Sequence, residues 1–189
     1  MTTYTLDTFL ADCRACVARP SEDVDRVRTI APFMLRLLEN GPAVLHGRQL
    51  HADPAHYTRN LIAEDPSAEM SLYALVWLPG QWTPVHDHGT WGVVGVVEGV
   101  IEEQSYMCEA GAIRADSGIR LKPGGLVLLP PGAVTTFVPN PDHIHMTGVA
   151  DDRPRAVSLH LYGRAMNSFH VYDVDAGTRR KIDVPHHKS

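Results

Sequence analysis

The spacing of apolar residues divides the chain into a helical N-terminal part and a longer part with the pattern of strands and turns. Ser21 and the acidic residues after it suit the start of a second helix, because a side-chain oxygen and negative charge both favour a helix N-terminus. Proline lacks the N–H that a helix needs, so we expect this helix to break at Pro32 or a new one to begin there. The first helical pattern consists of Leu6, Phe9, Leu10, Cys13 and Val17. Val24, Val27 and Ile30 give the expected buried stripe of the second, and the helical pattern after Pro32 runs through Leu35, Leu37 and Leu38.

From residue 57 onward, short runs rich in β-branched and aromatic residues alternate with turns rich in Gly, Pro, Asn and Asp. This spacing predicts an all-β antiparallel sandwich or jelly roll with N-terminal helices. We expect a single domain, with residues 1–41 as the helical cap, residues 42–189 as the jelly roll and the final His186-His187-Lys188-Ser189 as a solvated tail. The expected strands are residues 57–62, 70–78, 93–97, 126–129, 144–149, 156–162 and 169–174.

Composition narrows the class of partner. The 189 residues are 44% hydrophobic and carry a net charge of -5, which suits one buried core and disfavours a surface for nucleic acid or anionic membranes. The N-terminus lacks the pattern of a signal peptide, and no segment approaches the roughly 20 apolar residues that span a bilayer. We therefore expect a cytoplasmic protein with a small-molecule substrate, and the sequence does not indicate an oligomeric state.

Three cysteines, Cys13, Cys16 and Cys108, cannot all pair, and we expect them to be reduced. Cys13 and Cys16 form a C-x-x-C inside the first helical pattern, with no second pair for a zinc site. Packing on a helix face is therefore expected over redox or metal chemistry.

The most informative motif is the pair His86 and His88. Residues two apart in a strand point to one face, so these two imidazoles can meet at one metal ion. Apolar runs at residues 72–78 and 92–97 lead into and out of the motif, which indicates two strands joined at a metal corner. The alternative is a surface loop in a chain that contains 11 histidines.

A second constellation lies in residues 156–162, Ala-Val-Ser-Leu-His-Leu-Tyr. Ser158, His160 and Tyr162 alternate with apolar residues, so we expect them to share one face of a buried strand. Buried polar groups need hydrogen-bond partners. Away from a metal, a satisfied core network would be the simpler interpretation.

These motifs carry a family resemblance. Gly80-x5-His86-x-His88 followed by Gly99 resembles the first cupin motif, and Gly124-x5-Pro130-x-Gly132 resembles the start of the second. Three further segments resemble signature segments of the cysteine dioxygenase family, and the resemblance extends over residues 57–173. These segments are Tyr-Thr-Arg-Asn-Leu at 57–61, Pro-Val-His-Asp-His at 84–88, and Ala-Val-Ser-Leu-His-Leu-Tyr at 156–162.

The resemblance implies a cupin jelly roll and an Fe(2+) site held by three histidines. The cupin Glu ligand is absent, since Gly92 and Val93 stand where it would fall. His86 and His88 match two of the family's ligands. The third lies thirteen residues before the serine of the Ser-x-His-x-Tyr strand in the family, which reaches His145 here. His143 shares a strand face with His145 and remains a competitor.

The resemblance also implies an activity, the oxidation of L-cysteine by O2 to cysteine sulfinic acid. Arg59 is expected to bind the substrate carboxylate through its guanidinium, with Tyr57 adding a phenolic hydrogen bond. Ser158, His160 and Tyr162 are expected to form a relay toward the space where O2 and substrate meet. In some family members the tyrosine is crosslinked to a cysteine, but the matching position here is Gly92. We therefore expect an uncrosslinked Tyr162.

Other interpretations stay open at this point. Family members that oxidise 3-mercaptopropionate tend to have Gln in place of Arg59, so another small thiol is the first alternative. A non-catalytic metal-binding cupin is the second, and a cupin enzyme using zinc, manganese or nickel is the third. Trp77, Trp82 and Trp91 could wall the pocket or pack in the core, and we expect His170 to be structural.

Overall fold

Two helices precede a β-rich body, as the apolar pattern predicts. Helix α1 spans Leu6–Val17 and α2 spans Asp23–Leu38, and the short 3-10 helices η1 (Gly41–Val44) and η2 (Gly47–Leu50) lead into the first strand. None of the helices in the described part of the chain is long and apolar enough to cross a membrane. The computed structural model describes residues 3–109, 113, 115–139, 143–184 and 187–188.

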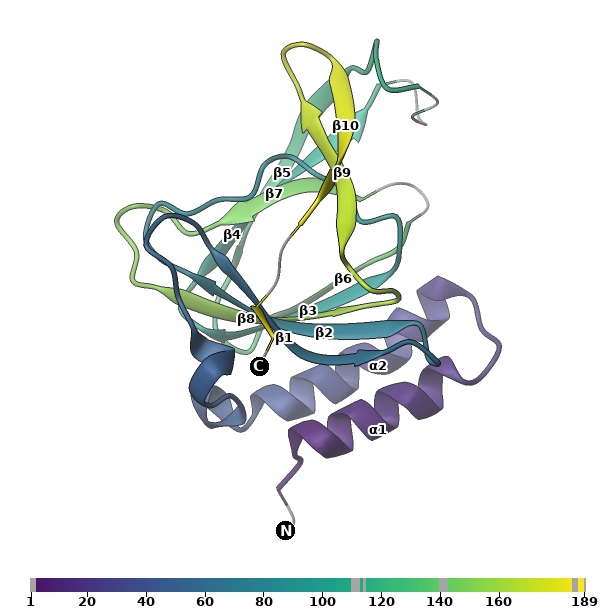
Figure 1. Ribbon diagram of the computed structural model, residues 1–189, viewed down its shortest axis with the longest axis vertical. Coiled ribbons are helices and arrows are strands. Elements are labelled where there is room, and N and C mark those ends of the chain that lie inside the picture. The colour runs from purple at the N-terminus through teal and green to yellow at the C-terminus, as the bar shows by residue number, and fades with distance from the viewer. Residues whose placement is uncertain (1–2, 110–112, 114, 140–142, 185–186, 189) are drawn as a thin grey trace.

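The strands form two facing layers (Figure 1). The larger layer is one sheet in the order β11-β1-β2-β8-β3-β6, and the other contains β5-β4-β7 and the β9–β10 hairpin. The segment between β2 and β3 connects the two parts of this second layer. Its residues Trp82 and His86 pair with β7, and His86 also pairs with Val171 of β9. The strands are β1 (Thr58–Asp65), β2 (Met70–Trp77), β3 (Gly92–Glu98), β4 (Ile101–Cys108), β5 (Leu121–Leu129), β6 (Val134–Phe137), β7 (Ile144–Gly148), β8 (Ala156–Tyr162), β9 (Ser168–Asp173), β10 (Thr178–Asp183) and β11 (His187–Lys188).

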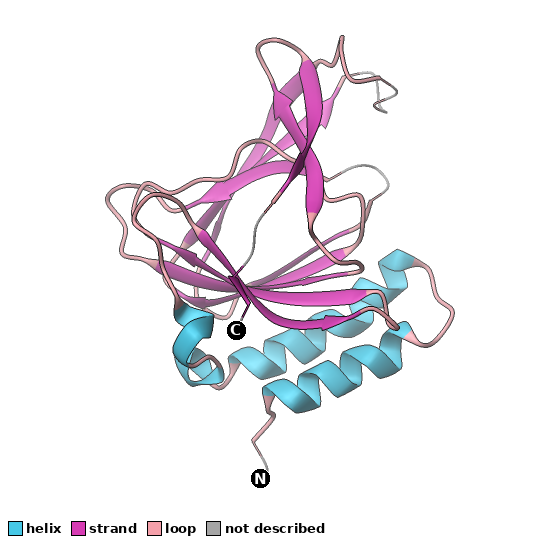
Figure 2. Cartoon of the chain, in the orientation of Figure 1, coloured by secondary structure: helices cyan, strands magenta, loops and turns pink. Residues whose placement is uncertain are grey.

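The larger sheet is covered on both faces. Figure 2 shows the two helices lying across one of them, where Phe9, Ile30 and Met34 pack with Leu72 and Leu159. The other face shares a core with strands of the opposite layer. Every residue of β2 and β8 is buried as a result, which confirms the predicted jelly roll with helices on one side.

A glycine sets the distance between α2 and the sheet. A Cβ atom at Gly95 of β3 would lie 2.7 Å from Cγ of Met34. Any larger residue there would require the side chains of Met34 and Leu38, or the helix that carries them, to shift, because a contact that short is strongly repulsive. The absent side chain thus lets α2 approach the strands that carry the candidate site.

Three details of the helical prediction are wrong. Val24, expected in the buried stripe, is 42% exposed. Pro32 lies inside α2, which continues to Leu38, and Glu22 rather than Ser21 occupies the N-cap position. Proline removes one helix hydrogen bond, but the buried stripe on both sides of Pro32 packs against the sheet and holds the helix together. That stripe consists of Val27, Ile30, Met34, Leu37 and Leu38.

The strand prediction misses β4, β6, β10 and β11. Strand β4 has the sequence IEEQSYMC and is mostly half-buried, so its apolar alternation is weak. The predicted solvated tail is also wrong in part, because His187 and Lys188 pair in parallel with Asn60 and Leu61 of β1. His186 and Ser189 lie outside the described residues. All three cysteines are free, and Cys13 is buried in the helix–sheet core as predicted.

Candidate functional site

Three histidines converge between the two layers. His86 and His145 are joined by two backbone hydrogen bonds, from the His86 N–H to the His145 carbonyl at 2.8 Å and back at 3.0 Å. The side chains of His86, His88 and His145 are buried, and their nitrogens lie within 4.8 Å of one another. The sheet therefore brings together three imidazoles from residues far apart in sequence, at a separation that one metal ion could bridge.

The protonation of these histidines suits metal binding. Burial is the main cause that lowers the pKa of His86, His88 and His145, and neighbouring imidazoles add to the effect. The Nδ1 atom of His86 faces the Pro84 carbonyl at 3.0 Å, which leaves its Nε2 to act as a ligand. Nδ1 of His88 and Nε2 of His145 are buried without a hydrogen-bond partner in the described part of the chain. Buried polar atoms rarely stay unsatisfied, so this donor set fits a metal ion.

His143, the rival third ligand, belongs to a different group of donors. Its Nε2 lies 3.5 Å from Oε1 of Glu103, and its ring stacks on Phe137 at 4.8 Å. The donors that cluster with His143 are those of Glu103 and His145, whereas His86 and His88 cluster with His145. The geometry thus favours His145 over His143 as the partner of the His86–His88 pair.

Glu103 on β4 is a candidate residue that the sequence interpretation missed. Its Oε2 lies 3.3 Å from Nδ1 of His145, and only 13% of its side chain is exposed. Burial would raise the pKa of this carboxyl, but the contacts with His143 and His145 outweigh burial and hold it below its ordinary value. A carboxylate here can orient the His145 ring, because outer carboxylates commonly fix the tautomer and angle of a metal-binding imidazole.

The polar face of β8 forms a continuous hydrogen-bonded row. The Trp77 indole donates to Oγ of Ser158 at 3.0 Å, Ser158 meets Nε2 of His160 at 2.8 Å, and Nδ1 of His160 meets the Tyr162 hydroxyl at 3.1 Å. An indole can only donate. Every proton in these bonds finds an acceptor if Ser158 donates to His160 and His160 donates to Tyr162. The Tyr162 proton is then available to the space beside the histidines.

The row is electrically neutral. Burial, together with the nearby His145 and Arg59, lowers the pKa of His160 to about 3. Burial also raises the pKa of the Tyr162 phenol above its ordinary value. The Tyr162 ring centroid is 5.5 Å from that of His88, so a neutral phenol lies next to the three-histidine group.

The space next to Tyr162 on β3 is filled by a ring. Gly92 pairs with both Tyr162 and Phe137, and a Cβ atom at Gly92 would lie 2.2 Å from Cζ of Phe137. Phe137 thus takes the volume that a side chain at residue 92 would need. With glycine at this position, Tyr162 has no sulfur partner there.

Arg59 lies on the same inward face as the β8 row. Arg59 pairs with Leu75 of β2, and Leu75 pairs with Ser158 of β8, so the three side chains point the same way. The guanidinium is buried, donates to the Met166 carbonyl at 2.6 Å and lies 4.7 Å from the ring of Tyr73. A fixed positive charge therefore lies in the layer that holds His160 and Tyr162.

Tyr57, just before β1, stacks on Trp77 with 4.6 Å between ring centroids. Burial raises the pKa of the Tyr57 phenol above its ordinary value, and the charge of Arg59 offsets only part of this rise. The structure thus places Tyr57 near Arg59 and against Trp77, which donates to the start of the β8 row.

Two more residues hold the ligand segment in place. Asp87 points away from the histidines and accepts hydrogen bonds from the His170 N–H at 3.1 Å and the Tyr172 hydroxyl at 2.7 Å. Arg164 donates to the His88 carbonyl at 2.8 Å. Neither role is visible in the sequence, because each depends on a contact more than seventy residues away along the chain.

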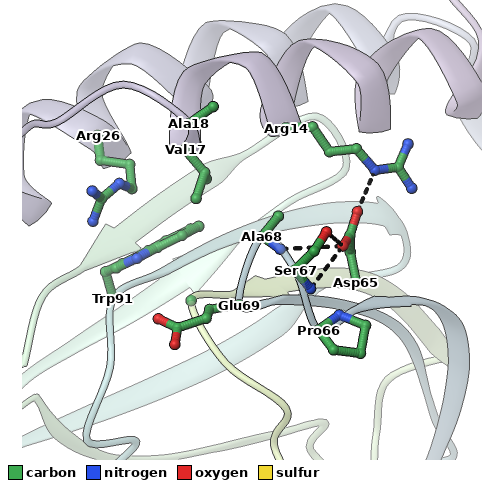
Figure 3. Close-up of a pocket in the computed structure, with 11 residues that line it drawn as sticks. Arg14, Val17, Ala18, Arg26, Asp65, Pro66, Ser67, Ala68, Glu69 and Trp91 are labelled. Carbon is green, nitrogen blue, oxygen red and sulfur yellow. Dashed lines mark hydrogen bonds and ion pairs between the residues drawn. The ribbon is translucent and has the colours of Figure 1, made fainter.

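The three tryptophans have different surroundings. Trp77 joins the β8 row, and Trp82 packs against Gly148 of β7. Trp91 instead lines a separate cavity of about 510 Å³ between the helices and the β1–β2 turn, with Arg26 at 5.8 Å from its ring (Figure 3). The other lining residues are Arg14, Val17, Ala18, Asp65, Pro66, Ser67, Ala68, Glu69 and Gly163. None of the three histidines lines this cavity.

A family model described as cysteine dioxygenase type I matches residues 4–175. Among solved structures, a double-stranded β-helix protein from Klebsiella pneumoniae is 11% identical with a TM-score of 0.46, covering 74% of this chain and 97% of that one. A cupin-like protein from Thermotoga maritima is 16% identical with a TM-score of 0.41, covering 74% of this chain and 88% of that one.

Proposed function

Because the chain belongs to the cysteine dioxygenase type I family, we propose that it oxidises L-cysteine with O2 to cysteine sulfinic acid. The family assignment itself supports a thiol dioxygenase, with a small-molecule substrate and O2 as reactants. The ion that we propose is Fe(2+), held by His86, His88 and His145. The observation that carries this proposal is the group of three buried, neutral imidazoles beside a neutral tyrosine and a buried arginine.

Ferrous iron fits the donor set. Three neutral imidazoles on one side of an ion leave positions open on the other, the arrangement that non-haem iron oxygenases require, although many of them use a carboxylate as one ligand. When bound, the iron would lower the pKa of the substrate thiol and give sulfur and O2 a common centre. The protein's own residues would then bind the substrate, orient it and donate hydrogen bonds and protons to it.

Arg59 would bind the substrate carboxylate. A guanidinium and a carboxylate form two parallel charge-assisted hydrogen bonds, and the bond to the Met166 carbonyl fixes the orientation of the guanidinium. Tyr57, held by its stack on Trp77, would donate to the same carboxylate. With its carboxylate anchored, the substrate would keep its thiol directed at the three histidines, which lowers the entropy lost on reaching the reactive arrangement.

Tyr162 would supply a hydrogen bond where oxygen adds to sulfur. The direction of the β8 row leaves its hydroxyl proton free to donate, and Ser158 and His160 hold the phenol in place. The reaction adds both atoms of O2 to the thiol sulfur and forms two S–O bonds. The thiol proton is returned in the sulfinic acid, so the balance needs no external reductant.

The proposal is tested by a panel of thiols. Protein loaded anaerobically with Fe(2+) would be assayed for O2 uptake with L-cysteine, 3-mercaptopropionate and cysteamine, and the products identified by mass spectrometry. We expect L-cysteine to have the highest kcat/KM, with one O2 consumed per sulfinate. A higher kcat/KM for 3-mercaptopropionate would overturn the substrate, and no sulfinate from any thiol would leave a non-catalytic metal-binding cupin. Activity only with another metal would contradict the assignment of Fe(2+) as the bound ion.

Removing the Tyr162 hydroxyl tests the relay. We expect Tyr162→Phe to lower kcat by about 100-fold, at the low end of what a positioned proton donor contributes, and to leave Fe(2+) binding unchanged. The measurement is steady-state O2 uptake alongside iron content. Tyr106→Phe is the matched control, since its hydroxyl donates to the Met146 sulfur at 3.5 Å. Equal kcat values for the two variants would refute the role of Tyr162.

Neutralising Glu103 tests its contact with His145. We expect Glu103→Gln to weaken Fe(2+) binding by about 10-fold or more, as the loss of outer carboxylates does in other metal sites. The measurement is the Kd from anaerobic titration with Fe(2+). Glu102→Gln is the matched control, because this neighbour on β4 pairs with Arg153 at 2.9 Å instead. Unchanged affinity in Glu103→Gln would show that His145 needs no carboxylate to bind iron.

A further inference from the structure

Strand β5 presents an exposed apolar edge. Within the described residues it pairs only with β4, so the backbone groups on its other side have no strand partner. Leu126, Val127 and Leu128 are 57%, 50% and 52% exposed, although all three are large apolar residues. Three such residues in a row on a free edge mark a site where another strand can add.

Only part of this strand is protected against pairing. Lys122 and Pro123 stand in its first half, and charge and proline are the usual means of blocking an edge. A register irregularity follows, where the Gln104 side chain donates to the Gly124 carbonyl at 3.1 Å and Ser105 donates to the Gly125 carbonyl at 3.1 Å. Residues 126–129 return to regular pairing with β4 and carry neither a charge nor a proline.

We propose that this strand edge is the interface of a homodimer, in which residues 126–128 of two copies pair in antiparallel fashion. A two-fold axis at Val127 would place Val127 opposite its equivalent, and Leu126 opposite Leu128 of the second copy. A two-fold interface brings each side chain close to its own copy, so it requires an uncharged and self-complementary pattern. Leu-Val-Leu has that pattern, which favours a second copy over a different protein.

The flanking charges are compatible with this pairing. Leu128 lies opposite Glu102 on β4, and the Glu102 carboxylate is paired with Arg153 at 2.9 Å within the same copy. Like charges are therefore not brought together unpaired at the axis. Pairing would join the two β5-β4-β7 sheets into one continuous sheet across both copies.

The interface would also border the three-histidine group. Val127 pairs directly with Glu103, so the two side chains lie on the same face of β4 and β5. Glu103 in turn contacts His145. The dimer axis therefore lies one strand away from the carboxylate that contacts the third histidine.

The expected dimer is weak. An interface centred on three residues of one strand is at the small end of the range, where specific complexes bury less than about 1,200 Å² and dissociate readily. We expect a monomer of 20.8 kDa on dilution and a species of twice that mass when concentrated. Sedimentation of the full-length protein from about 1 μM to about 1 mM, a range that covers weak association, would measure this equilibrium.

Charge at the axis provides the decisive variant. Val127→Lys would place two lysines face to face, and we expect it to be monomeric over the whole range with its far-UV circular dichroism unchanged. Leu128→Glu, off the axis, should weaken the dimer as well. Leu35→Lys is the matched control, because Leu35 is 48% exposed but lies on α2, and its association should match the wild type.

Two results would overturn the proposal. One is a wild-type chain that stays monomeric at every concentration, which would also be the outcome if a different protein occupied this edge. The other is a dimer that persists in both Val127→Lys and Leu128→Glu, since it would have to form through another surface. Should Val127→Lys fail to fold, Leu128→Glu alone decides between these results.

Discussion

Replacing His145 with alanine is expected to abolish stoichiometric Fe(2+) binding, whereas replacing His143 with alanine should preserve it. His145 shares its cluster of nitrogens with His86 and His88, while His143 faces Glu103. Loss of one of only three protein ligands should exceed the about 10- to 100-fold loss of affinity that follows removal of an outer partner. The measurement is iron content after anaerobic loading and gel filtration, followed by thiol-dependent O2 uptake.

The same pair of variants contains its own control. Both remove one imidazole from β7 or its approach, so a general loss of stability would affect both, and the thermal midpoint of each apoprotein would report it. Iron bound by His145→Ala and lost by His143→Ala would reverse the assignment of the third ligand. If both variants retain stoichiometric iron, the proposed three-histidine site is wrong.

Replacing Arg59 with glutamine is expected to lower kcat/KM for L-cysteine by about 10- to 100-fold. Hydrogen bonds to charged groups contribute about 1.5–3 kcal/mol, and each 1.4 kcal/mol corresponds to about a factor of ten. Glutamine keeps a neutral hydrogen-bond donor on β1 but lacks the positive charge and the second hydrogen bond of the guanidinium–carboxylate pair. The measurement is steady-state O2 uptake, and the loss should fall mainly on KM because the bond forms before the reaction.

A substrate without a carboxylate isolates this effect. Cysteamine carries the thiol and the amine alone, so the Arg59→Gln variant and the wild type should bind it equally as a substrate or as a competitor of L-cysteine. Arg155→Gln is the matched variant, since this arginine pairs with Glu98 at 3.0 Å on the surface. An equal loss with cysteamine would mean that Arg59 supports the fold rather than the carboxylate.

The positions that follow a local period were predictable. The side chains of Ser158, His160 and Tyr162 fall on one face of β8 because strand residues alternate, and the structure joins them in one row. His86 and His88 also converge, although they lie in the segment between β2 and β3, where His86 forms only isolated pairs. These features depend on neighbours in sequence, so a pattern of two residues is enough to find them.

The features that depend on register were not predictable. His145 lies on β7 and His143 just before it, and only the hydrogen bonds between His86 and His145 fix which of them meets the first two histidines. Glu103 reaches His145 because β4 lies beside β7, and β4 itself was missed. The continuity of α2 through Pro32 likewise depends on tertiary packing, which a local propensity does not contain.

The His86 backbone is held from both sides, by β7 through His145 and by β9 through its pairing with Val171. The main chain alone therefore sets the positions of His86 and His145, two of the three proposed ligands. In small zinc domains the ion organises the chain, and the binding energy is consumed in folding. Here the sheet is already assembled around the ligands, so an ion could enter or leave by rotation of side chains, and iron exchange should be a local event that leaves the jelly roll folded.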